Sequence, residues 1–129
     1  MSKAELIEKA PISLTKLKEE LNRIQKRDEE MSFRAGKALD YINSFAVTSK
    51  KKHSEAKSQI EALNVPRLKD VHISKILDFM PKSVNELGVI LQGYTLTVTK
   101  DNMAKIVQIT KNVWIFCPLN HNVYIFDNQ

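Results

Sequence analysis

The residues able to do chemistry are few in this sequence and lie far apart. Its three histidines are His53, His72 and His121, and its only cysteine is Cys117. Protein zinc sites take closely spaced Cys and His ligands, and this spacing does not occur in the sequence. Cys117 lies in the apolar run VWIFCPL, which provides no cationic neighbour to lower the pKa of a thiol. We therefore predict no metal site and no cofactor.

Two carboxylates are the next candidates for catalysis. Asp70 and Asp78 are eight residues apart and fall roughly on one face of a predicted helix. Paired carboxylates can act as general acid and base, but carboxylates two turns apart on a charged helix are more often solvated. The three glycines are isolated, so no glycine loop is available to bind phosphate. We predict no catalytic residue and expect that the chain is not an enzyme by itself.

Basic side chains are distributed unevenly. The chain has a net charge of +5, and residues 50–82 hold eight basic but only four acidic residues. A local excess of positive charge attracts a phosphate backbone, although lysines also serve simply as solvated surface. The candidate RNA-binding residues are Lys50, Lys51, Lys52, Arg67, Lys69, Lys75 and Lys82. Because aromatic residues do not interleave with them, the pattern favours backbone contact over base stacking.

The spacing of apolar residues predicts the elements that position these side chains. Residues 4–12 contain a proline and no helical stripe, which predicts an extended segment. Ser13 then caps a helix that continues to about residue 30. Its apolar residues form one narrow stripe: Leu14, Leu17, Leu21 and Ile24. A narrow stripe on an otherwise charged helix is typical of packing against one partner surface.

Five further helices are predicted, over residues 33–46, 50–63, 68–80, 84–91 and 100–112. Ser32 is expected to start the first of these, whose apolar stripe continues through Phe45, and Thr99 to cap the last. Pro66 and Pro81 end the third and fourth helices. The sequence SVNE predicts a capping box in which Ser83 and Glu86 bond each other's backbone amides. The last four or five helices are expected to pack as a small orthogonal bundle, so the predicted fold class is all-α.

Residues 113–129 differ in character from the rest of the chain. The runs VWIFCPL and VYIF are apolar and rich in aromatic residues, and NHN separates them. This pattern predicts a short terminal β-hairpin, which exposes a free edge unless it joins another sheet. The sequence indicates no role for this tail.

Four blocks of the sequence resemble the F-type subunit of archaeal DNA-directed RNA polymerase, the counterpart of the fourth subunit of eukaryotic RNA polymerase II. The blocks are APISLTKLKEEL (10–21), MSFRAGKALDYINSFA (31–46), ILDFMPKSVNELGVIL (76–91) and LTVTKDNMAKIVQIT (96–110). The third block carries the signature I-x-D-x-x-P-x-x-x-x-E-L-x-x-I-L through Ile76, Asp78, Pro81, Glu86, Leu87, Ile90 and Leu91. The chain departs from the family at Gly88, where a basic residue is common, and in its tail, because family members usually end soon after the last helix.

The resemblance implies a non-catalytic subunit that forms a heterodimer with the E-type subunit of the polymerase. Together the two form a stalk that contacts emerging RNA and initiation factors, while the large subunits carry the catalysis. It also implies a docking leader and first helix over residues 1–30, an HRDC-like bundle over 31–112 and a tail over 113–129. The implied docking residues are Ile7, Pro11, Ile12, Leu14, Leu17 and Leu21. For those in the helix, packing within the chain is an equally good interpretation.

Two alternatives stay open at this point. In the first, the chain is a free-standing HRDC-like nucleic-acid-binding domain. In the second, it is the equivalent subunit of a eukaryotic-type RNA polymerase III.

The composition indicates where the protein is located. A single cysteine fits a reducing compartment, and no segment approaches the roughly 20 apolar residues that a membrane span needs. We therefore expect a cytoplasmic location and no membrane partner.

Overall fold

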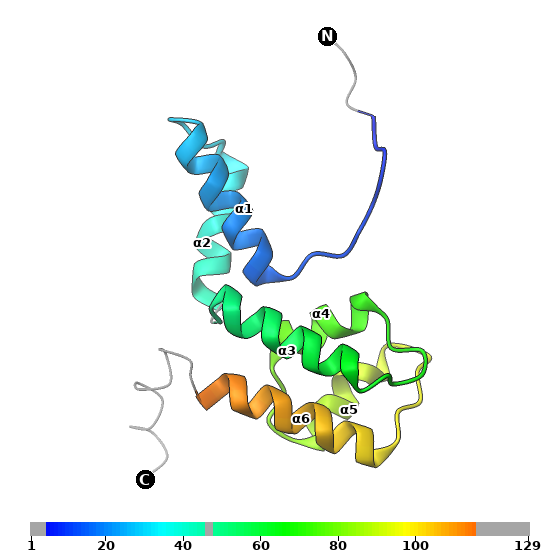
Figure 1. The fold of residues 1–129 in the computed structure, drawn as a ribbon. Helices are drawn as coiled ribbons and strands as arrows, with labels where there is room; N and C mark the ends of the chain where they lie inside the picture. Colours follow the sequence, from blue (N-terminus) through cyan, green and yellow to red (C-terminus); the bar gives the residue numbers. More distant parts are fainter. Residues whose placement is uncertain (1–4, 46–47, 116–129) are drawn as a thin grey trace.

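The computed structural model describes residues 5–45 and 48–115, and in these ranges every regular element is an α-helix (Figure 1). The helices are α1 (Leu14–Arg27), α2 (Phe33–Phe45), α3 (Lys50–Ala62), α4 (Asp70–Phe79), α5 (Val84–Gln92) and α6 (Lys100–Ile115). The predicted all-α fold is confirmed. The prediction that the terminal hairpin begins at residue 113 is wrong for residues 113–115, because the apolar periodicity of α6 continues and the helix runs to Ile115. The rest of the predicted hairpin, with Cys117 and His121, lies outside the described residues.

Side-chain hydroxyls cap four of the described helices, with Ser13 at α1, Ser32 at α2, Ser83 at α5 and Thr99 at α6. The Ser13 hydroxyl accepts a hydrogen bond from the Lys16 backbone N–H at 3.4 Å, and Thr99 caps α6 in the same way through Asn102. The capping box at α5 is formed in part, since the Glu86 amide donates to Ser83 Oγ at 3.2 Å. The Glu86 carboxylate accepts from the Lys82 amide at 2.7 Å, one residue earlier than the box predicts. These local bonds satisfy amides that have no partner inside the helix.

Three helix ends differ from the prediction by two or more residues: α6 continues three residues further, to Ile115, and at the other two ends the backbone becomes extended. α1 ends at Arg27 rather than near residue 30, since Asp28 has φ −102° and ψ 121°. α4 begins at Asp70 rather than at residue 68, since Lys69 is extended and its amide donates to His72 Nδ1 at 3.0 Å. A charged sequence without an apolar stripe gives few signals for such ends.

The corner between α4 and α5 is held by α6. Met80 ends α4 in the left-handed region with φ 45°, and Pro81 follows it. The fully buried Thr110 hydroxyl of α6 donates to the Pro81 carbonyl oxygen at 2.8 Å. A buried carbonyl without a partner costs free energy, so this bond fixes the corner against the last helix.

Two hydrophobic clusters divide the buried residues. The larger one is formed by α3 to α6 and the α3–α4 connection, with Ala56, Ile60, Val65, Ile73, Ile76, Leu77, Met80, Leu87, Leu91, Ile106, Val107 and Val113. The smaller one joins α1 to α2 through Leu21, Leu39 and Ile42. The domain boundary at residue 31, which groups α2 with the later helices, stays a prediction. The packing adds that the buried side chains of α2 face α1.

The α1–α2 hairpin stands at the end of the bundle at which α3 begins (Figure 1). The extended leader that precedes α1 runs away from the helices instead of packing on them. The fold thus consists of a four-helix bundle, a helical hairpin attached to one end of it, and a leader that projects from the attachment point.

Candidate functional site

The leader carries the most exposed apolar side chains among the predicted docking residues. Ile7 is 96% exposed, Ile12 is 45% exposed and Pro11 is also on the surface. Leu6, which the sequence analysis did not select, is 79% exposed. Isolated surface leucines need no explanation, but several aliphatic side chains along one extended segment form a candidate binding surface.

The predicted docking residues of α1 are placed differently. Leu21 is buried in the cluster shared with α2, and Leu14 and Leu17 are half-buried against the same cluster. Because these side chains pack within the chain, the apolar stripe of α1 can be explained without a partner protein. Only the half-exposed parts of Leu14 and Leu17 remain available for a second protein.

The predicted RNA-binding residues are spread along the bundle. Lys50, Lys51 and Lys52 occupy the first turn of α3, where successive side chains point in different directions. Arg67 and Lys69 lie beyond the other end of this helix, which is about 20 Å long at 1.5 Å per residue. The two remaining candidates are Lys75 on α4 and Lys82 at the corner before α5. The structure does not gather all seven into one patch.

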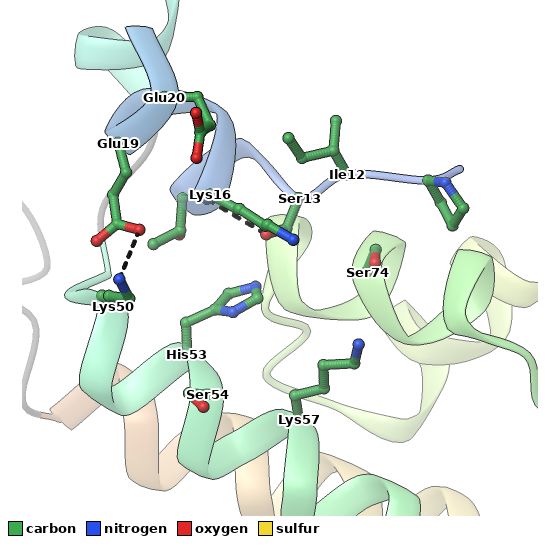
Figure 2. A pocket seen from close by; sticks show the side chains of 12 residues that line it. Ile12, Ser13, Lys16, Glu19, Glu20, Lys50, His53, Ser54, Lys57 and Ser74 are labelled. Carbon is green, nitrogen blue, oxygen red and sulfur yellow. Dashed lines mark hydrogen bonds and ion pairs between the residues drawn. The ribbon is translucent and has the colours of Figure 1, made fainter. Parts of the chain in front are cut away.

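A cleft lies where the leader and the start of α1 meet α3 and α4 (Figure 2). It encloses about 330 Å³ and is lined by Pro11, Ile12, Ser13, Thr15, Lys16, Glu19, Glu20, Lys50, His53, Ser54, Lys57 and Ser74. Lys50 Nζ lies 3.2 Å from Glu19 Oε2, an exposed ion pair that links α3 to α1. Such a pair contributes little to stability, so other contacts must hold the junction.

Asp78 supplies the main polar contact of this junction. Its Oδ1 accepts a hydrogen bond of 3.0 Å from the backbone N–H of Leu14, the first residue of α1. That amide has no partner inside α1, and a carboxylate at a helix N-terminus also interacts favourably with the helix dipole. The expectation that Asp78 is simply solvated is wrong, because the side chain is half-buried under α1. The signature motif, which includes Asp78, was the available signal for this role.

His53 of α3 lies in the same junction. Its Nε2 is buried without a hydrogen-bond partner among the described residues. Burial lowers the pKa of His53, nearby Lys57 lowers it further, and Asp78 opposes this shift. Burial raises the pKa of Asp78, while the Leu14 amide, His53 and Lys75 oppose that shift. The junction therefore favours a neutral imidazole.

A second hollow was not predicted from the sequence. It encloses about 420 Å³ between the ends of α2 and α4 and is lined by Leu14, Tyr41, Phe45, Lys75, Asp78, Phe79 and Met80. We call it the aromatic groove. Phe45 was expected to continue the buried stripe of α2, but it is 57% exposed, and Tyr41 and Phe79 are 58% and 62% exposed. Lys75 Nζ lies 4.8 Å from the centroid of the Phe79 ring, so one candidate lysine does adjoin an aromatic side chain.

These arrangements position helices and expose surfaces, and they do not assemble a reacting group. In the part of the chain that the structure describes, no cluster of three or more His, Cys, Asp or Glu side chains is placed to share a metal ion. Across the same residues, no helix is long and apolar enough to cross a membrane.

The role of Asp78 can be tested at one amide. We expect Asp78→Ala to speed hydrogen exchange of the Leu14 amide about fivefold, since a hydrogen bond worth about 1 kcal/mol is lost. Asp78→Asn keeps an acceptor oxygen and should preserve much of the protection. Asp70→Ala, on the exposed side of the same helix, is the control. Unchanged exchange of Leu14 in Asp78→Ala would refute the assignment.

The lowered pKa of His53 predicts a pH dependence of stability. In the unfolded chain the pKa of His53 is near the ordinary histidine value of 6.5, while the folded chain binds this proton less readily. The free energy of unfolding should therefore fall as the pH is lowered from 6.5 through the folded pKa. We expect His53→Gln to flatten this slope in urea denaturation at stepped pH. Asp78 acts in the opposite direction, since its stabilising contribution is lost as the pH rises from 3.8 through its raised pKa. The comparison is therefore repeated in chains that carry Asp78→Asn. The prediction for His53 is contradicted if His53→Gln leaves the pH dependence of the free energy of unfolding unchanged both with Asp78 and with Asp78→Asn.

The junction and the leader belong to a segment that matches a known family. The family model described as RNA polymerase Rpb4 matches residues 4–114, which include the leader, both helical clusters and the α4–α5 corner. Comparison with individual curated proteins gave no match. Since the family match spans most of the chain, the chain belongs to the RNA polymerase Rpb4 family, whose members are non-catalytic subunits that associate with the RNA polymerase core.

Proposed function

We propose that this chain pairs with a second polymerase subunit, the counterpart of the archaeal E-type subunit, and that the pair forms a stalk beside the RNA exit path. In this proposal the chain is an archaeal F-type subunit, and residues 31–112 form its HRDC-like bundle. The observation that carries the proposal is the projecting leader with exposed Leu6, Ile7 and Ile12, inside the segment that matches the family.

The chemistry of the leader suits a protein partner. An extended segment has free backbone N–H and C=O groups, which can pair with a sheet edge while alternate side chains enter pockets. Residues 5–12 span about 26 Å at 3.3 Å per residue, enough to cross a partner domain. In this proposal the leader makes the main contact with the partner subunit. Leu14 and Leu17 contribute from α1, and Leu21 mainly holds the hairpin together.

Substitutions in the leader test the pairing directly. We co-express the chain with the E-type subunit encoded in the same genome and measure the complex by size-exclusion chromatography with mass determination. The wild-type chain should form a one-to-one complex. Ile7→Asp with Ile12→Asp should weaken it at least tenfold, since burying an unpaired carboxylate costs more than about 1.4 kcal/mol.

The matched control is Val89→Asp on α5, an aliphatic residue that is 70% exposed but far from the leader in the sequence. It should pair like the wild type. Pairing that survives the leader substitutions would remove the docking assignment. A stable monomer that ignores the E-type subunit altogether would favour the free-standing HRDC-like nucleic-acid-binding domain.

We further propose that the paired stalk contacts emerging RNA through exposed lysines of the bundle. The local excess of positive charge in residues 50–82 supports this, and so does the exposure of Lys51 and Lys69. Their distribution over both ends of α3 suits a backbone that runs along the bundle, with each contact adding a little affinity.

The salt dependence of RNA binding tests this contact. For the complex with Lys51→Gln and Lys69→Gln, the slope of log affinity against log salt should become shallower by about 0.7 for each lost phosphate contact. Binding of single-stranded RNA is measured by fluorescence anisotropy over a salt series. Lys18→Gln with Lys26→Gln on α1 serves as the charge-matched control. If both pairs shift the slope equally, the lysines of the bundle have no particular role.

A further inference from the structure

The aromatic groove collects apolar surface that nothing in the described residues covers. Tyr41, Phe45 and Phe79 are each more than half exposed, although all three line one hollow. The Tyr41 and Phe45 ring centroids are 4.7 Å apart, so they form a continuous aromatic wall on α2. Exposed aromatic surface of this kind, rimmed by charged groups, marks a site where another segment binds.

The last helix ends beside this groove. Thr110 of α6 is bonded to the Pro81 carbonyl, and Pro81 directly follows Met80, which lines the groove. Ile115 is five residues further along α6, about 7.5 Å at the rise of a helix. Val113 lines a small cleft together with Lys52 of the first turn of α3, and Thr48, just before that turn, donates to Met80 Sδ at 3.2 Å. The C-terminal end of α6 therefore lies near the start of α3 and the end of α2 (Figure 1), and the end of α2 lines the groove.

The sequence that follows is rich in large apolar residues. Residues 116–129 read FCPLNHNVYIFDNQ and lie beyond the family match. The apolar run VYIF begins at Val123, and the seven residues before it can span about 24 Å. In an extended segment, Tyr124 and Phe126 share one face. The groove volume lies within the range of about 300–1,000 Å³ that holds drug-sized ligands, so large side chains fit.

The charges of the two surfaces also match. Asp127 is the only acidic residue of the segment, which contains no lysine or arginine, and it directly follows the apolar run. Lys75 lies over Phe79 at the rim of the groove and offers a cation to a carboxylate there. A partner protein or RNA could also use an aromatic wall, but this segment combines proximity, apolar side chains and a single complementary charge.

We propose that residues 116–129 bind in the aromatic groove of the same chain, with the run VYIF covering Tyr41, Phe45 and Phe79. The segment acts as an intramolecular strap that ties α6 to the α1–α2 hairpin. Asp78 and Leu14 both line the groove, so an occupant of the groove borders the hydrogen bond between them. The binding is independent of the pairing proposed above.

A spin label at the end of the segment tests the strap in the full chain. Cys117→Ser removes the only thiol, and Asn128→Cys places a nitroxide beyond the apolar run. The label should broaden the backbone amide signals of Tyr41, Phe45 and Phe79 more strongly than those of Val71 and Val89. Tyr41→Lys with Phe79→Lys should abolish the broadening. Both positions are more than half exposed, so the fold tolerates the change.

Phe33→Lys is the matched control, since Phe33 is an exposed aromatic residue of α2 that does not line the groove. It should leave the broadening intact. Three results would overturn the strap. The first is no broadening at the groove. The second is broadening only between chains, seen when spin-labelled chains are mixed with separate isotope-labelled ones, which assigns the groove to a second copy. The third is unchanged broadening in Tyr41→Lys with Phe79→Lys while pairing with the E-type subunit or RNA binding is lost, which assigns the groove to that partner.

Discussion

The unsatisfied amides at the start of α1 are the constraint on which the arrangement of this molecule depends. The backbone N–H groups in the first turn of a helix have no partners inside the helix. At α1 the Ser13 hydroxyl accepts a hydrogen bond from only one of them, that of Lys16. The Leu14 amide is satisfied by Asp78, a residue 64 positions away on α4. This bond fixes where the hairpin meets the bundle, and it explains why a carboxylate stays half-buried despite the cost of removing it from water.

The same junction determines how the leader leaves the molecule. The hairpin and the bundle have separate hydrophobic clusters, so neither cluster holds the leader in place. The leader emerges directly from the cap at Ser13, and its aliphatic side chains are left in water. A helical base with an extended, apolar arm suits a subunit that associates with a larger polymerase, because such an arm offers backbone groups and aliphatic side chains to another protein.

The surfaces divide into three kinds, and each suits a different contact. The leader is aliphatic and extended, the lysines of the bundle are exposed and dispersed, and the aromatic groove is concave and placed near the end of α6. Only concave apolar surface can bury aromatic side chains efficiently, whereas dispersed cations suit a flexible phosphate backbone. The groove borders the Asp78–Leu14 bond, so whatever occupies it also changes the solvent exposure of the junction.

The sequence by itself determined the helices, because their apolar periodicity and their caps are local. Ser13, Ser83 and Thr99 each accept a hydrogen bond from the amide three residues later. Pro81 lacks a backbone N–H and cannot continue the helix that precedes it. Tertiary structure alone decided the contacts between distant residues. Periodicity predicted a buried Phe45, whereas the packing leaves this side chain 57% exposed in a hollow between α2 and α4. It likewise treated Asp78 as one more charge on a polar face, because the amide that the carboxylate satisfies lies 64 residues away, and only the packing of α1 on α4 brings them together.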